Sequence, residues 1–390
     1  MIEVEEARLL ISKNCPPPET ENIPLERAFG FAVALPPVSP IDTPPFDQSA
    51  MDGYCFAFGP PSDQPLIVTG EIQAGGFCRD ELKPGTCMRI FTGACIPSGA
   101  DTVVMQENTR REGDLVFITD NKLTKDSNVR KRGSQTVTGQ SLLPEGCLLT
   151  PAAVSFLAGT GVTEVTVYSK PSASLIVTGK ELVKPGFELA EGKIYESNSY
   201  GLTAALNQIG IVPDYTGFAD DTAIDIENEF LIAKKSDLVI ITGGISVGDY
   251  DLVKVVLESS GVKTIFHKVK QKPGKPFYFG KLNDKLIFAL PGNPAAVLSC
   301  FYNFVVPAIG QITAIQYFRS FNLKIKSDYQ KKNDLTLFLK GKTAGDEVEI
   351  LTHQESYLLN SFSEADCMVE LAGGKRLFAA GEPVRVRMIV

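Results

Sequence analysis

The chain has 390 residues, of which 44% are hydrophobic and 22% are charged, and its formal net charge is -8. This length suggests two to four domains, and the acidic balance argues against a nucleic-acid-binding protein, whose surface is usually basic. Eight cysteines without a C-x-x-C pair and only two histidines argue against a structural zinc site and against histidine-based catalysis. No signal peptide and no apolar run of roughly 18 residues stand out, so we expect a cytoplasmic protein with reduced thiols and no membrane contact.

The N-terminal part of the chain combines helical and proline-rich segments. Residues 1–35 are predicted to be helical up to the triple proline at 16–18, because apolar side chains recur at helical spacing from Val4 onward. The proline-rich stretch 36–45 predicts a crossing into another domain. Helical character returns at 151–158, so we expect the two helical pieces to pack together as one elongated domain.

Two parts of the chain are predicted to be rich in β-strands. Within 46–139, short apolar runs alternate with Gly, Pro, Asn and Asp, a pattern typical of a small β module inserted between the helical pieces. Strand-like runs within 315–390 predict a second small β domain at the C-terminus.

From about residue 171 the pattern alternates between strands and helices. The predicted elements are a strand at 174–178, a helix from Asn198, a strand near 211–217, a helix at 221–235, and strands at 237–242 and 285–290. Such alternation predicts βαβ units on a parallel sheet. Ligands of these sheets bind at the carboxyl ends of the strands, so the breaks at Gly179, Gly243 and Gly292 should cluster at one edge.

Two glycine loops, 243–248 and 291–294, follow apolar strands and open helices. Backbone N–H groups in such loops, together with a helix N-terminus, bind anions such as phosphate, although a simple βα turn would also use glycine. Asp249, Asp251 and the acidic pair 220–221 suit a divalent cation that bridges to phosphate oxygens. The same carboxylates could instead only stabilise helix N-termini.

The remaining polar candidates each have two interpretations. Lys272 and Lys275 flank a stiff Pro-Gly turn and suit a small oxyanion, or they are solvated surface residues. Asn293 can bind a ligand through its amide, or it can cap the next helix. Both His267 and His353 are predicted to be structural, and the cysteines to be small buried residues.

Together these segments resemble the MoeA/gephyrin family, the molybdopterin molybdenumtransferases. The matching segments are 44–54, 92–94, 97–101, 103–107, 129–130 with Gly133, 178–179, 181–182, 197–198, 243–251, 272–276 and 290–294. They run through most of the chain, and the C-terminal module matches weakly.

The resemblance implies a multidomain α/β protein. Its parts would be a discontinuous elongated helical domain (1–39 and 140–170), an inserted β-rich domain (40–139), a doubly wound α/β domain of the molybdopterin-binding type (171–314) and a C-terminal β domain (315–390). It also implies a homodimer whose active sites are shared between subunits, so that Asp52 acts across the interface. The adenylyltransferase of the same pathway is a candidate partner.

The implied reaction is the last step of molybdenum cofactor synthesis. Adenylylated molybdopterin binds, molybdate is inserted at its dithiolene, and the pyrophosphate bond is cleaved with release of AMP, with Mg²⁺ as the cofactor. The implied catalytic residues are Asp52, Glu181, Asp220 and Asp251, of which Asp220 and Asp251 would also hold Mg²⁺. The implied substrate-binding residues are Ser49, Thr178, Gly179, Asn198, Gly243, Gly244, Ser246, Gly248, Pro291, Gly292, Asn293 and Pro294. The implied molybdate ligands are Lys272, Lys275 and Ser361.

The chain departs from the family pattern at several positions. An acidic active-site position is replaced at Ser134–Gln135, Lys180 stands where the family has aspartate, Ala296 replaces a serine, and Lys340 replaces an arginine. Two alternatives therefore stay open. The protein could be a molybdopterin adenylyltransferase, or a catalytically weakened relative that binds pterin or scaffolds partners.

Overall fold

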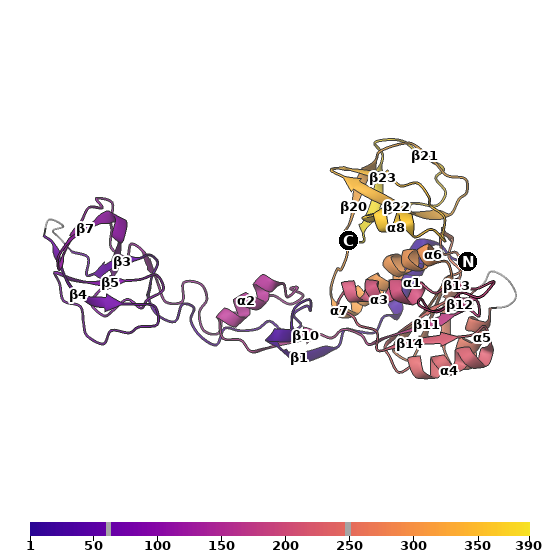
Figure 1. The fold of residues 1–390 in the computed structure, drawn as a ribbon, viewed down its shortest axis with the longest axis horizontal. Coiled ribbons are helices and arrows are strands. Elements are labelled where there is room, and N and C mark those ends of the chain that lie inside the picture. The colour runs from indigo at the N-terminus through magenta and orange to yellow at the C-terminus, as the bar shows by residue number, and fades with distance from the viewer. Residues whose placement is uncertain (60–63, 246–250) are drawn as a thin grey trace. The chain divides into compact units, whose positions relative to one another are not determined.

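The computed structural model describes residues 1–59, 64–245 and 251–390, and its element labels are those of Figure 1. Packing divides the chain into two units. Met1–Glu21, Gly30–Ala32 and Val167–Val390 form the first, here called the α/β unit. Asn22–Phe29 and Val33–Thr166 form the second, here called the β-rich unit.

The α/β unit is built on a central sheet with the strand order β14-β11-β15-β19-β18-β16. These strands are β14 (Tyr215–Ala219), β11 (Ala173–Thr178), β15 (Leu238–Thr242), β19 (Lys285–Leu290), β18 (Tyr278–Leu282) and β16 (Lys263–His267). The first four are parallel, as predicted, and β18 and β16 add an antiparallel edge. Every residue of β11 and β15 is buried, as expected of parallel strands covered on both faces.

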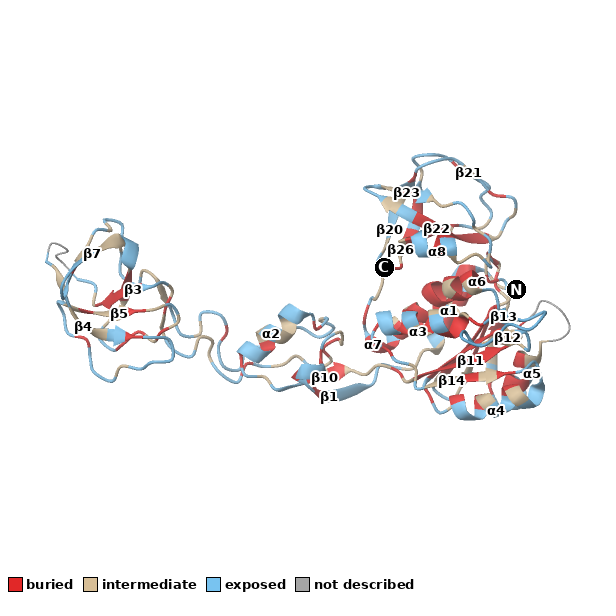
Figure 2. Ribbon diagram, viewed as in Figure 1, coloured by how far each residue is buried: buried red, intermediate tan, exposed pale blue. Residues whose placement is uncertain are grey.

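Helices cover both faces of this sheet (Figures 1 and 2). On one face lie α1 (Val4–Asn14), α3 (Asn198–Gln208), α6 (Pro294–Cys300), the π-helical segment η3 (Phe301–Val305) and α7 (Val306–Thr313). On the other face lie α4 (Ala223–Ala233) and α5 (Leu252–Ser259). The doubly wound arrangement predicted from the alternating pattern is therefore confirmed.

The continuous helix Pro294–Thr313 corrects the expectation that the chain has no apolar stretch of roughly 18 residues. Within the described residues it is long and apolar enough, by length and composition, to cross a membrane. The sequence analysis missed it because polar residues such as Ser299 and Asn303 interrupt the apolar run. In the structure 78% of its apolar window is buried, and its residues pack into the core of the α/β unit (Figure 2).

The predicted N-terminal helix ends before the triple proline, as expected, and it packs against the α/β core. It ends at Asn14, just before the triple proline, and the chain then forms β1 (Thr20–Pro24) and a 3₁₀ turn. Its apolar stripe, Val4, Ala7 and Ile11, is buried in the same cluster as α7. Periodicity reveals such a stripe, but it cannot tell which core the stripe will join.

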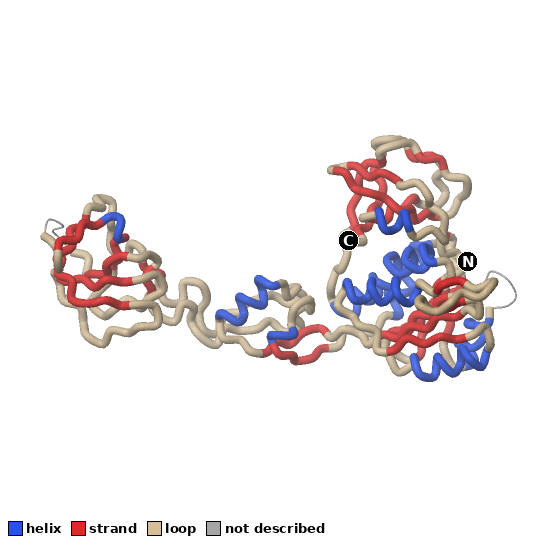
Figure 3. The backbone as a smooth tube through the Cα atoms, in the orientation of Figure 1, coloured by secondary structure: helices blue, strands red, loops and turns tan. Residues whose placement is uncertain are grey.

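The β-rich unit contains a sheet with the strand order β6-β3-β5-β4-β8-β7. Its strands are β3 (Gly53–Phe56), β4 (Leu66–Ile72), β5 (Thr86–Ile90), β6 (Thr102–Met105), β7 (Thr109–Glu112) and β8 (Leu115–Ile118). Short pairs join β2 (Gln48–Ser49) to β9 (Val129–Arg130), and β1 to β10 (Glu164–Tyr168). The predicted helix at 151–158 is α2 (Pro151–Gly159), one of the helices drawn in blue in Figure 3. Thr150 Oγ1 caps it by accepting from Ala153 N at 3.2 Å.

The C-terminal part of the α/β unit is a closed barrel. Its strands are β20 (Ser320–Ile325), β22 (Thr336–Ala344), β23 (Glu347–Ile350), β24 (Cys367–Leu371) and β26 (Pro383–Met388), and the pairing of β22 with β24 closes the ring. The short strand β17 (Gln271–Lys272) pairs with β22, so the barrel is joined to the loop that holds Lys272. Smaller elements are β21 (Tyr329–Gln330), β25 (Leu377–Phe378) and α8 (Asn360–Glu364).

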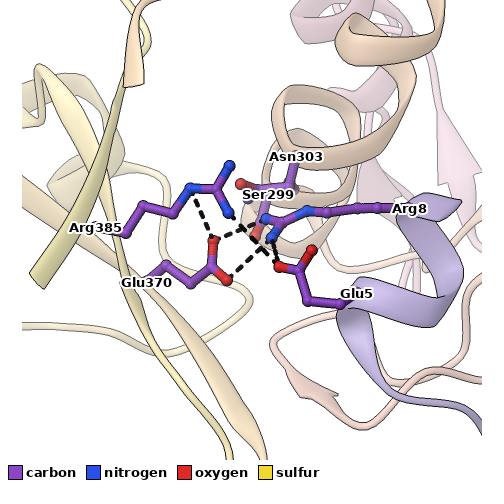
Figure 4. A network of polar contacts seen from close by, with 6 residues as sticks. All are labelled: Glu5, Arg8, Ser299, Asn303, Glu370 and Arg385. Atoms are coloured by element: carbon purple, nitrogen blue, oxygen red, sulfur yellow. Dashed lines mark hydrogen bonds and ion pairs between the residues drawn. The ribbon is translucent and has the colours of Figure 1, made fainter. Parts of the chain in front are cut away.

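A network of polar contacts joins α1 to the barrel (Figure 4). Arg8 Nη1 and Nη2 donate to Glu370 Oε1 and Oε2 at 3.0 and 2.8 Å, a bidentate pair between the first helix and β24. The two side chains are only 15% and 14% exposed. Glu5 and Arg385 complete the network, with Arg385 Nη1 3.5 Å from Glu5 Oε1.

We expect Arg8→Met to lower the stability of the α/β unit by about 2–3 kcal/mol, because removing one partner of a mostly buried ion pair leaves the other charge unpaired. Methionine keeps the apolar stem that packs beside Phe304 and Phe338. The matched control is Lys326→Met, whose pair with Glu349 is about half exposed and should contribute under about 1 kcal/mol. Urea unfolding midpoints measure both, and equal shifts would contradict the expectation.

Candidate functional site

The carboxyl ends of three neighbouring parallel strands form the edge at which the predicted ligand site lies. In β11, β15 and β19 the register aligns Val177 with Thr242 and Thr242 with Leu290. The glycine breaks that follow these strands therefore meet, as predicted. They border a cavity of about 640 Å³, a volume in the usual range for a small-molecule site.

The break after β15 needs glycine at two successive positions. Gly243 and Gly244 have φ values of +83° and +63°. A Cβ on Gly243 would lie 2.3 Å from the Thr178 carbonyl oxygen, and one on Gly244 would lie 2.5 Å from Val253 Cγ2. The backbone can therefore form this part of the cavity wall only without side chains, as in loops that bring N–H groups close to phosphates.

Many of the predicted binding residues come together here. The cavity is lined by the predicted residues Thr178, Gly179, Glu181, Asn198, Gly243, Gly244, Gly292, Asn293 and Pro294. Pro291 is buried and does not line it. Ser246 and Gly248 lie outside the described residues.

Asn198 has a side chain of a type that often caps helices, but it does not cap the helix that was predicted to start there. It is the first residue of α3, and its Nδ2 donates to the Gly292 carbonyl oxygen at 2.9 Å, which ties α3 to the 291–294 loop. Its Oδ1 is buried without a hydrogen-bond partner among the described residues. An unpaired buried acceptor in a cavity wall is a group that a ligand donor can satisfy.

The cap of α3 comes instead from Glu196, which the sequence analysis missed. Its Oε1 accepts from Ser199 N and its Oε2 from Ser199 Oγ, both at 2.6 Å, and the residue is only 2% exposed. A glutamate three residues before a serine in the first helical turn is the signal that could have identified it. Glu196 also lines the cavity, so it places a carboxylate in the wall.

A β-ribbon and the C-terminal part complete the wall. The ribbon pairs β12 (Leu182–Val183) with β13 (Ile194–Tyr195), and Leu182, Ile194 and Tyr195 line the cavity. The barrel part contributes Tyr357. Asn293 Nδ2 donates to Ser356 Oγ at 2.8 Å and makes no side-chain cap of α6, so the helix-capping interpretation of its amide is wrong.

The segment that contains Ser356 and Tyr357 is held by Lys340, which stands at the expected arginine position. Lys340 is 3% exposed, and its Nζ donates to the carbonyl oxygens of His353 and Leu358 at 2.8 and 3.2 Å. Burial lowers its pKa. This side chain therefore orders the loop that reaches the cavity.

Asp251 is the N-cap of α5, directly before Leu252, which lines the cavity. Its Oδ1 accepts from Lys254 N at 3.1 Å, so the helix-terminus interpretation applies to this atom. Its Oδ2 lies 2.8 Å from His267 Nε2, yet neither atom forms a regular hydrogen bond within the described residues. His267, predicted to be only structural, thus lies against a candidate catalytic carboxylate.

The predicted metal pair does not share one cavity. Asp220 lines a separate hollow of about 320 Å³ beside Asp225 and Glu229, on the other side of Gly179. In residues 1–59, 64–245 and 251–390 no group of three or more His, Cys, Asp or Glu side chains could hold a metal. The described residues therefore form no complete metal cage.

The predicted molybdate ligands are also dispersed. Lys272 lines another cavity, of about 240 Å³, together with Lys332 and Gln354. Lys275 is exposed and lines none of the cavities named here. Ser361 is 3% exposed, and its hydroxyl donates to the His353 carbonyl oxygen at 2.7 Å, so it is already engaged.

Two predicted residues lie in the β-rich unit. Asp52 is exposed, and hydrogen bonds from Thr92 N and Oγ1 at 2.8 and 2.7 Å hold its pKa below the usual value. This carboxylate is therefore ionised at neutral pH. Ser49 is buried and donates to the Met51 carbonyl oxygen at 2.6 Å, so its hydroxyl does not face solvent.

Comparison with known proteins covers almost the whole chain. The MoeA N-terminal region (domain I and II) matches residues 2–161, the probable molybdopterin binding domain matches 174–311, and the MoeA C-terminal region (domain IV) matches 322–389.

Named relatives agree with these matches. The molybdopterin molybdenumtransferase of Haemophilus influenzae is 33% identical, over 99% of this chain and 98% of that protein. The enzyme of the same name from Nostoc is 40% identical over 75% and 70%. A molybdopterin biosynthesis moeA protein from Pyrococcus horikoshii superposes with a TM-score of 0.82 at 28% identity, covering 100% of both chains. The chain therefore belongs to the MoeA family.

Proposed function

We propose that this protein is a molybdopterin molybdenumtransferase of molybdenum cofactor biosynthesis, which inserts molybdenum into adenylylated molybdopterin and releases AMP. One observation carries the proposal. Three glycine breaks at the carboxyl edge of a parallel sheet border a single cavity of about 640 Å³. A ligand that joins a pterin to a nucleotide through phosphates needs such a wall of close backbone amides.

The residues of this cavity suggest how the substrate is held. The backbone at Gly243, Gly244 and Gly292 would approach the phosphates, and Asn198 Oδ1 would accept a hydrogen bond from the substrate. Tyr195 and Tyr357 offer ring faces at the wall. Water or a molybdate oxygen can attack the phosphate, so no protein nucleophile is needed.

The molybdate site and the metal are further parts of the proposal. Lys272 supplies positive charge in a cavity that Glu355 also lines. Glu355 precedes Tyr357 of the substrate cavity by two residues, so one segment contributes to both cavities. Mg²⁺ would be held by Asp251 or Asp220 together with substrate phosphate oxygens, whose negative charge it would neutralise. The protein residues bind and orient the phosphates around it.

We include a cytoplasmic homodimer in the proposal. Asp52 lies in the β-rich unit and stays ionised, so it can serve the cavity of a partner subunit as an acidic group. The adenylyltransferase of the same pathway would produce the adenylylated molybdopterin that this protein uses, and it is the candidate partner.

The test is release of AMP. The purified protein with Mg²⁺ and molybdate should convert adenylylated molybdopterin to active cofactor, with one AMP for each cofactor formed. Absence of AMP at saturating substrate would contradict the proposal. Consumption of ATP with free molybdopterin would support the adenylyltransferase alternative.

Complementation addresses the weakened-relative alternative. Lys180 and Ser134–Gln135 replace family residues, and Ala296 is buried in α6. A strain lacking the transferase should recover molybdoenzyme activity when it expresses this chain. Failure, with normal protein levels, would favour a binding or scaffolding role.

A further inference from the structure

A further cavity, of about 400 Å³, lies in the α/β unit at the end of α7. Its apolar wall is formed by Val306, Pro307, Ile315 and Phe318, and its polar wall by Tyr317, Arg385 and Arg387. It shares no lining residue with the substrate cavity described above. None of the proposed functions uses it.

The arginines around this cavity differ in what they bind. Arg8 is engaged by Glu370 and Glu5, and Arg385 lies 3.5 Å from Glu5 and 4.0 Å from Glu370 (Figure 4). The guanidinium of Arg387, two residues further along β26, forms no side-chain hydrogen bond or ion pair within the described residues. Three guanidinium groups therefore share two carboxylates, and Arg387 is the one left over.

The surroundings of Arg387 make this excess charge costly. Burial, with Arg8 and Arg385 as like-charged neighbours, lowers the pKa of Arg387 to about 10. The side chain is therefore still charged at neutral pH. The nearby C-terminus of α7 carries a partial negative charge, which opposes an anion. That partial charge is smaller than the full positive charge of Arg387, so an anion beside the guanidinium would still be stabilised.

Tyr317 is a second polar residue in the same wall. Tyr317 Oη is buried and forms no hydrogen bond of regular geometry within the described residues. Thr313, the last residue of α7, lies four residues earlier, and its hydroxyl donates its own hydrogen to Ile309 O at 2.9 Å, which leaves it an acceptor for Tyr317. Burial raises the pKa of Tyr317, so its hydroxyl keeps its proton and remains a donor.

We propose that this cavity is a binding site for an organic anion, with its carboxylate or phosphate group on Arg387 and its apolar body against Pro307 and Phe318. A guanidinium presents a planar fork of donors that matches both anionic groups. The inference does not depend on the proposed transferase activity.

The test is calorimetric titration of the full chain with phenyl phosphate, benzoate and uncharged benzamide. The two anions should bind saturably, and benzamide should bind at least tenfold more weakly. Arg387→Gln should weaken anion binding about tenfold to a hundredfold, the usual range for a charged hydrogen bond. Arg319→Gln is the matched control, because Arg319 is exposed and does not line the cavity, and it should leave binding unchanged.

A second variant guards against a folding defect in Arg387→Gln. Arg387→Lys keeps a positive charge in the same wall but loses the planar fork of donors, so it should keep the unfolding midpoint while weakening anion binding severalfold. The ratio of the affinities for phenyl phosphate and benzoate identifies the preferred anionic group. Equal binding of benzamide and benzoate, unchanged binding by both variants, or no saturable binding of either anion would overturn the proposal. So would a changed oligomeric state of Arg387→Gln without loss of probe binding, since the cavity would then be a subunit contact.

Discussion

Asp251→Asn should lower the rate of AMP release at least a hundredfold and leave the unfolding midpoint nearly unchanged. Asparagine is as good an N-cap as aspartate, so the hydrogen bond from Lys254 N to the start of α5 can persist. What disappears is the negative charge beside Leu252, at the border of the cavity. A positioned side chain that transfers a proton in the transition state typically contributes a factor of about 10²–10⁴ to the rate. The measurement is AMP formation at saturating adenylylated molybdopterin and molybdate.

Two control variants separate the roles of this side chain. Asp251→Ala should show the same loss of rate and, in addition, a loss of about 1 kcal/mol of stability, because the cap is removed. His267→Gln removes the imidazole 2.8 Å from Asp251 Oδ2 and tests whether Asp251 acts through it. A smaller loss in His267→Gln than in Asp251→Asn would assign the main role to the carboxylate. Wild-type rates in Asp251→Asn would contradict the role proposed for Asp251.

The sequence was sufficient to predict the sheet edge because local patterns determine it. The strands β11, β15 and β19 are continuous apolar runs that end in glycine, and parallel strands place their carboxyl ends together. Gly179, Gly243 and Gly292 could therefore be assigned to one cavity before any contact was known. Strand type and direction are local or nearly local properties.

The residues that the sequence analysis missed or misassigned depend on contacts between distant segments. His267 approaches Asp251 only because the antiparallel strand β16 is added at the edge of the sheet. Tyr357 reaches the substrate cavity because Lys340 holds its loop from the barrel. Side-chain orientation within the barrel depends on closure between β22 and β24, which no periodic pattern encodes.

The dispersed lysines and carboxylates have a related explanation. Asp220 and Asp251 were expected to hold one cation, yet the strands that precede them, β14 and β15, lie on opposite sides of β11 in the sheet. The distance between the two loops thus follows from the strand order. A resemblance assigns a role to a residue without showing which contacts its side chain already makes. Ser49 and Ser361 were therefore expected to bind ligands, although their hydroxyls donate to backbone carbonyl oxygens within the fold.

Gly243→Ala should be the most damaging single methyl addition at the cavity. Its Cβ would lie 2.3 Å from the Thr178 carbonyl oxygen, which is backbone and cannot rotate away, and the residue has φ +83°. Strain in the left-handed region costs about 1–3 kcal/mol, and the clash adds to it by pushing β11 and β15 apart. We expect a loss of roughly 3–4 kcal/mol of stability in the α/β unit. The Michaelis constant for adenylylated molybdopterin should also rise at least tenfold.

The matched control isolates the clash from the backbone strain. Gly381 has φ +81°, nearly the same as Gly243, and a Cβ there would meet nothing within 4 Å. Gly381→Ala should therefore cost only the conformational part, about 1 kcal/mol, and should leave the Michaelis constant unchanged. If Gly243→Ala and Gly381→Ala shift the unfolding midpoint equally and both retain normal substrate affinity, close backbone approach is not what shapes the cavity. A Michaelis constant that rises in Gly243→Ala and not in Gly381→Ala would show that substrate affinity depends on the glycine break after β15. The proposed phosphate contacts depend on that break.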